Sequence, residues 1–143
     1  MPILGFIADD ELIEIYRSTR TIAVVGASTV ERNQSHRIPA YLQSQGYRII
    51  PVNPTTSEVL GEPTVDSLGD IGEPVDVVDV FRLSTETPAV AAEAVAIGAK
   101  VLWLQMGIRS DEAARIAREG GLTVVMDTCM GAVHKKLVRL GLV

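Results

Sequence analysis

The stretch Thr21–Ser28, TIAVVGAS, decides the fold. An apolar, β-branched run ends at Gly26 and a polar segment follows it, a pattern that indicates a buried parallel strand opening into a ligand-binding turn. The usual dinucleotide-binding fingerprint, G-x-G-x-x-G, has three glycines. In this chain its second and third positions are Ser28 and Glu31. A phosphate at this turn would therefore be held without the close approach that two further glycines allow.

Further short apolar runs follow along the chain, and helical segments separate them. The expected strands are 21–26, 47–54, 75–81, 100–107 and 122–127, and the expected helices are 9–18, 35–46, 87–99, 110–121 and 131–141. This alternation predicts an α/β fold with a doubly wound, Rossmann-like parallel sheet of five strands in three layers. Counted along the chain, the expected strand order is 3-2-1-4-5, with the ligand-binding reversal between the first and fourth strands.

Several single residues refine these elements. Asp9 or Asp10 is expected to cap the first helix, Ser35 the second and Ser110 the fourth. Pro51 falls inside the second strand, and a central strand excludes proline, so we expect this end of the strand to be irregular or partly unpaired.

Composition excludes several classes of function. The chain has 143 residues, which suits one domain over 1–143, and a formal net charge of -5, which leaves no basic footprint for nucleic acid. One cysteine rules out a disulfide framework within the chain, and the apolar runs are shorter than the ~20 residues that cross a membrane. We expect a soluble, cytoplasmic protein with a small-molecule ligand, and a homo-oligomer is left open.

The loops that follow the strands are rich in small polar residues and should open onto one edge of the sheet. Gly26 permits a sharp turn, and Ala27 and Ser28 can direct backbone N–H groups at a phosphate. Arg37 lies beside this turn at the start of a helix, where an anion is favoured. The alternative is that the glycine only turns the chain.

The tip of the second strand argues against NAD. A classical NAD site places an acidic residue there to bind the ribose hydroxyls, whereas this strand ends in Val52, Asn53 and Pro54. Its prolines form a rigid rim that suits a base or a pantetheine arm, or they simply end the strand.

Other strand ends supply further candidates. Phe81 and Arg82 can meet an adenine and a phosphate, unless Phe81 belongs to the core and Arg82 only to the surface. Gln105 and Gly107 lie where a ligand should pass. Cys129 follows the last strand and is interpreted as a small buried side chain rather than a nucleophile, since His134 is not placed to pair with it. The histidines and the cysteine lack metal-ligand spacing.

Five motifs, each at the end of a strand, carry a resemblance to a known family: VVGAS, GYRIIPVNP, VDVVDVFR, VLWLQMGI and GLTVVMDTCMG. Over residues 12–140 the chain resembles the small CoA-binding domains related to the N-terminal domain of the succinyl-CoA synthetase α subunit. The resemblance implies a Rossmann-type fold with coenzyme A in the crevice at the strand reversal. The synthetase acts through a phosphohistidine in a second domain that is absent here, so the resemblance implies binding and not ligase activity.

The resemblance also implies roles for particular residues. Gly26, Ala27 and Ser28 would meet the pyrophosphate, Asn53 and Pro54 would line the adenosine side, and 105–107 would pass the pantetheine arm. The full expected cofactor-binding set is Gly26, Ala27, Ser28, Arg37, Val52, Asn53, Pro54, Phe81, Arg82, Gln105 and Gly107. No catalytic or metal-binding residue is expected.

Three functions follow in order of preference. The first is a non-catalytic binding or sensor module for coenzyme A or a short acyl-CoA. The second is a small enzyme of thioester or thiol–disulfide chemistry that uses Cys129 or the thiol of coenzyme A. The third is an NAD(P)-binding redox sensor.

Overall fold

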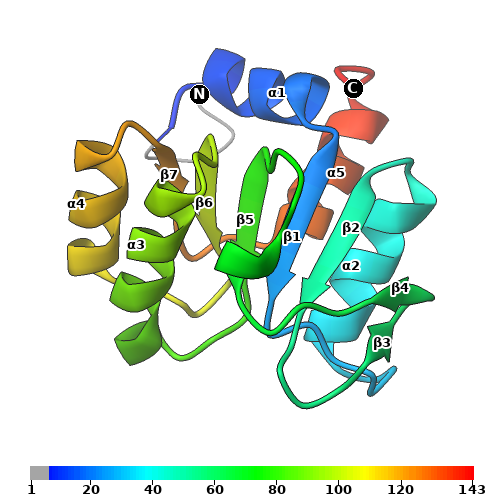
Figure 1. Cartoon of the computed structure of the whole chain (residues 1–143). Helices are drawn as coiled ribbons and strands as arrows, with labels where there is room; N and C mark the ends of the chain where they lie inside the picture. The colour runs from blue at the N-terminus through cyan, green and yellow to red at the C-terminus, as the bar shows by residue number, and fades with distance from the viewer. Residues whose placement is uncertain (1–6) are drawn as a thin grey trace.

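The computed structural model describes residues 7–143 and places them around a parallel sheet (Figure 1). The elements in chain order are α1 (Asp9–Ser18), β1 (Thr21–Val25), α2 (Gln34–Ser44), β2 (Arg48–Val52), β3 (Glu58–Val59), β4 (Glu62–Pro63), η1 (Leu68–Asp70), β5 (Val77–Val80), η2 (Ser84–Glu86), α3 (Thr87–Ala96), β6 (Val101–Leu104), α4 (Asp111–Glu119), β7 (Thr123–Val125) and α5 (Met130–Arg139). The elements η1 and η2 are short 3₁₀ helices, and β3 pairs with β4 as a small antiparallel hairpin.

The main sheet has five parallel strands in the order β2-β1-β5-β6-β7, which confirms the doubly wound fold. The expected strand order was wrong: counted along the chain, the observed order is 2-1-3-4-5 rather than 3-2-1-4-5. The strand order therefore reverses between β1 and β5, and the loops after these two strands flank the position where ligands bind in such sheets.

The segment between β2 and β5 explains the difference. Instead of an α-helix, residues 53–76 contain the β3–β4 hairpin and η1. Leu68 and Val75 from this segment are buried with the apolar residues of α3 and α4. The connection therefore crosses one face of the sheet and places β5 on the far side of β1.

Pro51 lies within a regular strand, contrary to the expectation of an irregular end. It is in register with Val24 of β1, and β2 is the edge strand of the main sheet. A proline is tolerated there because its missing N–H faces away from the neighbouring strand.

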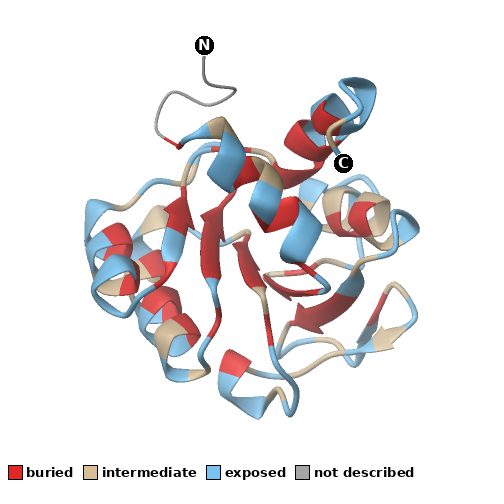
Figure 2. Ribbon diagram, turned by 90° about the horizontal axis from the view of Figure 1, so that it is seen from above, coloured by how far each residue is buried: buried red, intermediate tan, exposed pale blue. Residues whose placement is uncertain are grey.

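Helices cover both faces of the sheet, as the view from above shows (Figure 2). On one face, the alanine-rich sides of α3 and α4 pack on the strands, and on the other face α1, α2 and α5 bury larger side chains. Trp103 is fully buried in this second layer, where its indole N–H donates to the Thr128 carbonyl over 2.8 Å. All five strands are buried along most of their length, which explains their continuous apolar sequences.

One of the three predicted helix caps is confirmed. Ser110 caps α4 as expected, since its hydroxyl accepts from the Ala113 N–H over 3.0 Å. The other expected caps were wrong, because α1 follows Ala8 and α2 follows Asn33. Cys129 is the N-cap of α5, with its sulfur 3.4 Å from the Ala132 nitrogen.

Candidate functional site

The turn after β1 touches the end of β5. Gly26 has φ +88°, and its N–H donates to the Val52 carbonyl over 3.0 Å. A Cβ at this position would lie 2.7 Å from the Phe81 carbonyl oxygen. Both the left-handed backbone and the close approach therefore require glycine. The single glycine of the motif joins three strand ends at the reversal of strand order.

A cleft opens over these strand ends. It consists of two cavities that share Asn33, Ser35 and Arg82, and the one beside Phe81 has a volume of about 770 Å³. Their linings differ in chemistry. The cavity on the β2 side is lined mainly by small polar residues, namely Ser28, Thr29, Asn53, Thr55, Thr56 and Ser67. The other has an apolar side, formed by Phe81, Leu83 and Ile108, and we call it the apolar cavity, although Arg32, Arg82 and Glu86 also line it.

The N-terminus of α2 faces the cleft. Gln34 and Ser35 of its first turn line the cavities, and the Asn33 side chain makes no capping hydrogen bond to this turn. Instead, the Asn33 amide group donates to the Ser28 hydroxyl over 3.2 Å. The first N–H groups of a helix have no acceptor within the helix, and they carry the positive end of its dipole. The cleft is therefore suited to an anion at this point.

Ser28 organises the loop between β1 and α2. Its N–H donates to the Ser35 carbonyl over 3.2 Å, and its hydroxyl accepts from the Val30 N–H over 3.0 Å. Its carbonyl lies 2.8 Å from Nδ1 of His36, which is the donor in this pair. The Ser28 N–H that we expected to face a phosphate is thus bonded within the loop, while the residue itself lines the cleft.

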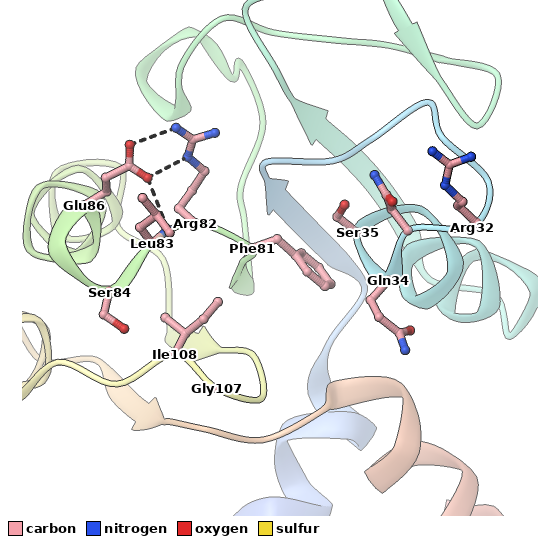
Figure 3. A pocket seen from close by; sticks show the side chains of 11 residues that line it. Arg32, Gln34, Ser35, Phe81, Arg82, Leu83, Ser84, Glu86, Gly107 and Ile108 are labelled. Carbon is pink, nitrogen blue, oxygen red and sulfur yellow. Dashed lines mark hydrogen bonds and ion pairs between the residues drawn. The ribbon is translucent and has the colours of Figure 1, made fainter.

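Arg82 is the cation that lines both cavities. Its guanidinium donates twice to Glu86, over 3.1 and 2.9 Å, in a fork that Figure 3 shows at the edge of the cleft. These hydrogen bonds hold the pKa of Glu86 below its usual range. The Phe81 ring stands in the middle of the same view, between Arg82 and the start of α2, and it is half-buried rather than part of the closed core.

Asn53 fixes the tip of β2 against the glycine turn. Its amide N–H₂ donates to the Ala27 carbonyl over 2.7 Å, and its amide oxygen accepts from the Thr55 N–H over 2.8 Å. Pro54 follows and lines the polar cavity. The structure also brings Asp66 to this cavity, an acidic residue that the strand tip itself lacks.

Three expected site residues contribute differently. Arg37 and Cys129 line a neighbouring cavity. Gln34 lines both this cavity and the cleft. Val52 is largely buried, lines the polar cavity, and contributes its carbonyl to the glycine turn. The Gln105 side chain is buried under the sheet edge and donates to Asp79. Contacts of these residues with a cofactor stay predictions.

Asp79 is not among the residues that the sequence pattern predicts for the site. It lies on β5 with its side chain fully buried, and one carboxylate oxygen, Oδ2, has no partner among the described residues. Burial raises its pKa to about 7, against a smaller lowering by the Gln105 hydrogen bond. The signal was an acid inside an otherwise apolar strand, VDVVDV, whose first aspartate, Asp76, accepts from the N–H groups of Arg20 and Thr21 at the opposite edge of the sheet.

A family model described as CoA binding domain matches residues 20–135. The chain belongs to this family. The match includes the glycine turn, the tip of β2 and both loops that bound the cleft, so the family resemblance in the sequence motifs is confirmed.

Relatives of this CoA-binding domain agree with the assignment. The uncharacterized protein YneT of Bacillus subtilis (strain 168) is 44% identical over 124 residues, which cover 87% of this chain and 92% of YneT. The structure of cell-free ID.343 from Thermus thermophilus is 41% identical, has a TM-score of 0.88, and is matched over 92% of this chain and 99% of its own.

A larger protein contains a similar unit. The dinucleotide forming acetyl-coenzyme A synthetase 1 of Ca. Korarchaeum cryptofilum is 26% identical with a TM-score of 0.71, over 80% of this chain and 28% of the synthetase chain. This fold therefore occurs both as most of a short chain and as part of a longer one. Within residues 7–143 of the CoA-binding domain, no helix is long and apolar enough to cross a membrane.

Proposed function

We propose that the protein binds coenzyme A, or a short acyl-CoA, in the cleft between β1 and β5. The observation that carries this proposal is the uncapped start of α2 beside the Gly26 turn, with Arg82 on the opposite wall. A diphosphate needs such convergent donors and a cation, because the net charge of -5 provides no general attraction for anions.

The two cavities suit the two ends of the ligand. The adenosine end fits the polar cavity at Asn53 and Pro54, and the pantetheine arm fits the apolar cavity at Phe81, Gly107 and Ile108. Gly107 has φ +86°, and its N–H donates to Asp127 over 2.6 Å, so the loop after β6 is fixed to the segment after β7 beside this cavity.

A binding or sensor role without catalysis fits the polar groups near the cleft. His134 is buried, and its Nδ1 lies 2.8 Å from the Tyr41 hydroxyl oxygen, so it is held by a tyrosine rather than by Cys129. Burial lowers the pKa of His134. The enzyme alternative would need a base for Cys129 or for the ligand thiol, and this histidine is poorly placed to serve as one.

One observation favours the NAD alternative. Asp66 lines the polar cavity, where its carboxylate can accept from the hydroxyls of a ribose. The same carboxylate would repel the 3′-phosphate of coenzyme A. Asp66→Asn therefore separates the two functions: it should weaken NAD binding if NAD is the ligand, and leave or strengthen coenzyme A binding if our proposal holds.

Calorimetric titration of the protein with coenzyme A and with NAD tests the proposal, together with a native mass spectrum for any nucleotide that co-purifies. We expect saturable binding of coenzyme A and much weaker binding of NAD. Tighter binding of NAD, with loss of affinity in Asp66→Asn, would overturn the proposal.

A further inference from the structure

Two of the most exposed large apolar side chains lie on the loops at one end of the cleft. Leu83 is 71% exposed on the loop after β5, and Met106 is 69% exposed on the loop after β6. Ile108 is partly buried and lines the same cavity as Leu83. We call Leu83, Met106 and Ile108 the apolar ledge.

Leu83 and Ile108 line one cavity, and Met106 lies two residues before Ile108 on the same loop. Strands β5 and β6 are parallel neighbours, so their following loops emerge side by side. The Arg109 N–H donates to the Ser84 hydroxyl over 3.1 Å, which ties the two loops together. Figure 3 shows Leu83 and Ile108 on the same side of the cleft, opposite the start of α2.

The two arginines on the loops of the ledge are already paired, and Arg32, which lines the same cavity, lies across the cleft beside the start of α2. Arg82 forms its fork with Glu86, and Arg109 lies 3.8 Å from the carboxylate of Asp127. An acyl group that ended in a carboxylate would compete with the diphosphate for Arg82 and with Asp127 for Arg109, and it would lose hydration against Leu83 and Met106. The surface therefore suits an uncharged aliphatic group.

We infer that the apolar ledge binds the acyl chain of an aliphatic acyl-CoA, so that the ligand of the cleft is a thioester with an uncharged hydrocarbon chain rather than free coenzyme A. This inference rests on the proposed function. Leu83 and Ile108 line the cavity that we assign to the pantetheine arm, so an acyl chain that leaves the thiol there would extend along these side chains toward Met106 on the same loop as Ile108.

The test is a calorimetric series of free coenzyme A and its acetyl, butanoyl, hexanoyl and octanoyl thioesters. A fully buried methylene contributes about 0.8 kcal/mol, or roughly fourfold in affinity. On an open ledge we expect about half of this burial, which gives roughly twofold tighter binding for each added methylene. Succinyl-CoA, whose acyl group also has four carbons, should bind severalfold more weakly than butanoyl-CoA.

Three variants separate the ledge from general effects. Leu83→Asn with Met106→Gln should abolish the dependence on chain length. Met106→Gln alone, at a residue that lines neither cavity of the cleft, should reduce this dependence and leave the affinity for free coenzyme A unchanged. The matched control, Val138→Thr with Leu140→Asn, changes two exposed apolar residues at the end of α5 and should keep the full dependence. Light scattering of each variant shows whether the mass in solution changes.

The outcomes decide between the readings. Equal affinity for free coenzyme A and octanoyl-CoA would overturn the inference while the proposed function stands. A wild-type dimer that the ledge variant converts to a monomer would also overturn it, because a second copy would then cover the ledge. If no coenzyme A species binds at all, the proposed function fails, and this inference fails with it.

Discussion

Gly26 combines two requirements that can be tested separately. Its φ of +88° strains any other residue, and a Cβ there would lie 2.7 Å from the backbone oxygen of Phe81. Gly46 has a similar φ of +98°, but a Cβ there would meet nothing within 4 Å. The pair therefore distinguishes backbone strain from close approach of β1 to β5.

We predict that Gly26→Ala destabilises the fold by more than Gly46→Ala and also removes coenzyme A binding. Both variants lose about 1–2 kcal/mol of stability because alanine is strained in the left-handed conformation. Only Gly26→Ala also brings a Cβ against the Phe81 carbonyl, which costs a further ~1–3 kcal/mol. Urea unfolding and calorimetry measure the two effects. Equal losses of stability in both variants would show that the contact with Phe81 relaxes freely.

Arg82 should matter for the ligand and little for the fold. We predict that Arg82→Gln weakens coenzyme A binding by about tenfold or more, since a hydrogen bond to a charged group contributes about 1.5–3 kcal/mol. The unfolding free energy should change by less than ~1 kcal/mol, because the pair with Glu86 is exposed. Arg115→Gln is the control, as Arg115 forms a similar exposed pair with Glu119 on α4. Similar affinities in both variants would remove Arg82 from the site.

Asp79 makes stability depend on pH in a defined direction. Burial raises its pKa to about 7, while in the unfolded chain it titrates near about 3.9. Between these values the native state holds a proton that the unfolded state has lost, so stability falls as pH rises and levels off above pH 7.

We predict that this group lowers the wild-type free energy of unfolding by ~2 kcal/mol between pH 5 and pH 7. Asp79→Asn keeps the acceptor for Gln105 and should remove that fall. Denaturant unfolding at both pH values gives the comparison, and His134 titrates equally in both proteins. A variant that loses as much stability as the wild type would show that Asp79 does not titrate in this range.

At the scale of elements, the start of α2 is the feature on which the anion site depends. Asn33→Asp would supply a better cap and place a negative charge where we put the diphosphate. We predict tenfold or weaker binding of coenzyme A with equal or higher stability. Asn33→Ala, which leaves this turn neutral and uncapped, should keep the affinity within about threefold. Unchanged binding in Asn33→Asp would place the anion elsewhere.

The elements themselves were largely predictable from sequence, and their order was not. Apolar runs, glycines and Ser110 located all five strands of the main sheet and α4, because local patterns determine local structure. The strand order depends on how 53–76 crosses the sheet. Pro51 indicated the correct order. A regular strand tolerates proline only at the edge of a sheet, and the order 3-2-1-4-5 places the second strand inside the sheet.

For the candidate site, the loops could be predicted from the sequence, whereas the placement of several side chains could not. The loops after β1, β2 and β5 were identified, since their glycine, asparagine and arginine stand at strand ends. The separation of Arg37 from the cleft, the arrival of Asp66 and the buried position of Gln105 depend on tertiary packing. Such packing leaves no local pattern in the sequence.

For the whole molecule, the sheet topology explains where the cleft lies. The reversal between β1 and β5 brings the glycine turn, Arg82 and the start of α2 together at one edge of the sheet, while Asp76 lies at the opposite edge. A ligand in the cleft should contact the edge with the glycine turn and leave the edge with Asp76 unchanged.

The most direct test is a titration of ¹⁵N-labelled protein with coenzyme A, followed by the amide resonances in two-dimensional NMR. The account predicts saturable shifts at Gly26, Ser35 and Arg82, at the same half-saturation for each, with Asp76 unmoved. Absence of any shift, or shifts confined to residues around Asp76, would contradict it.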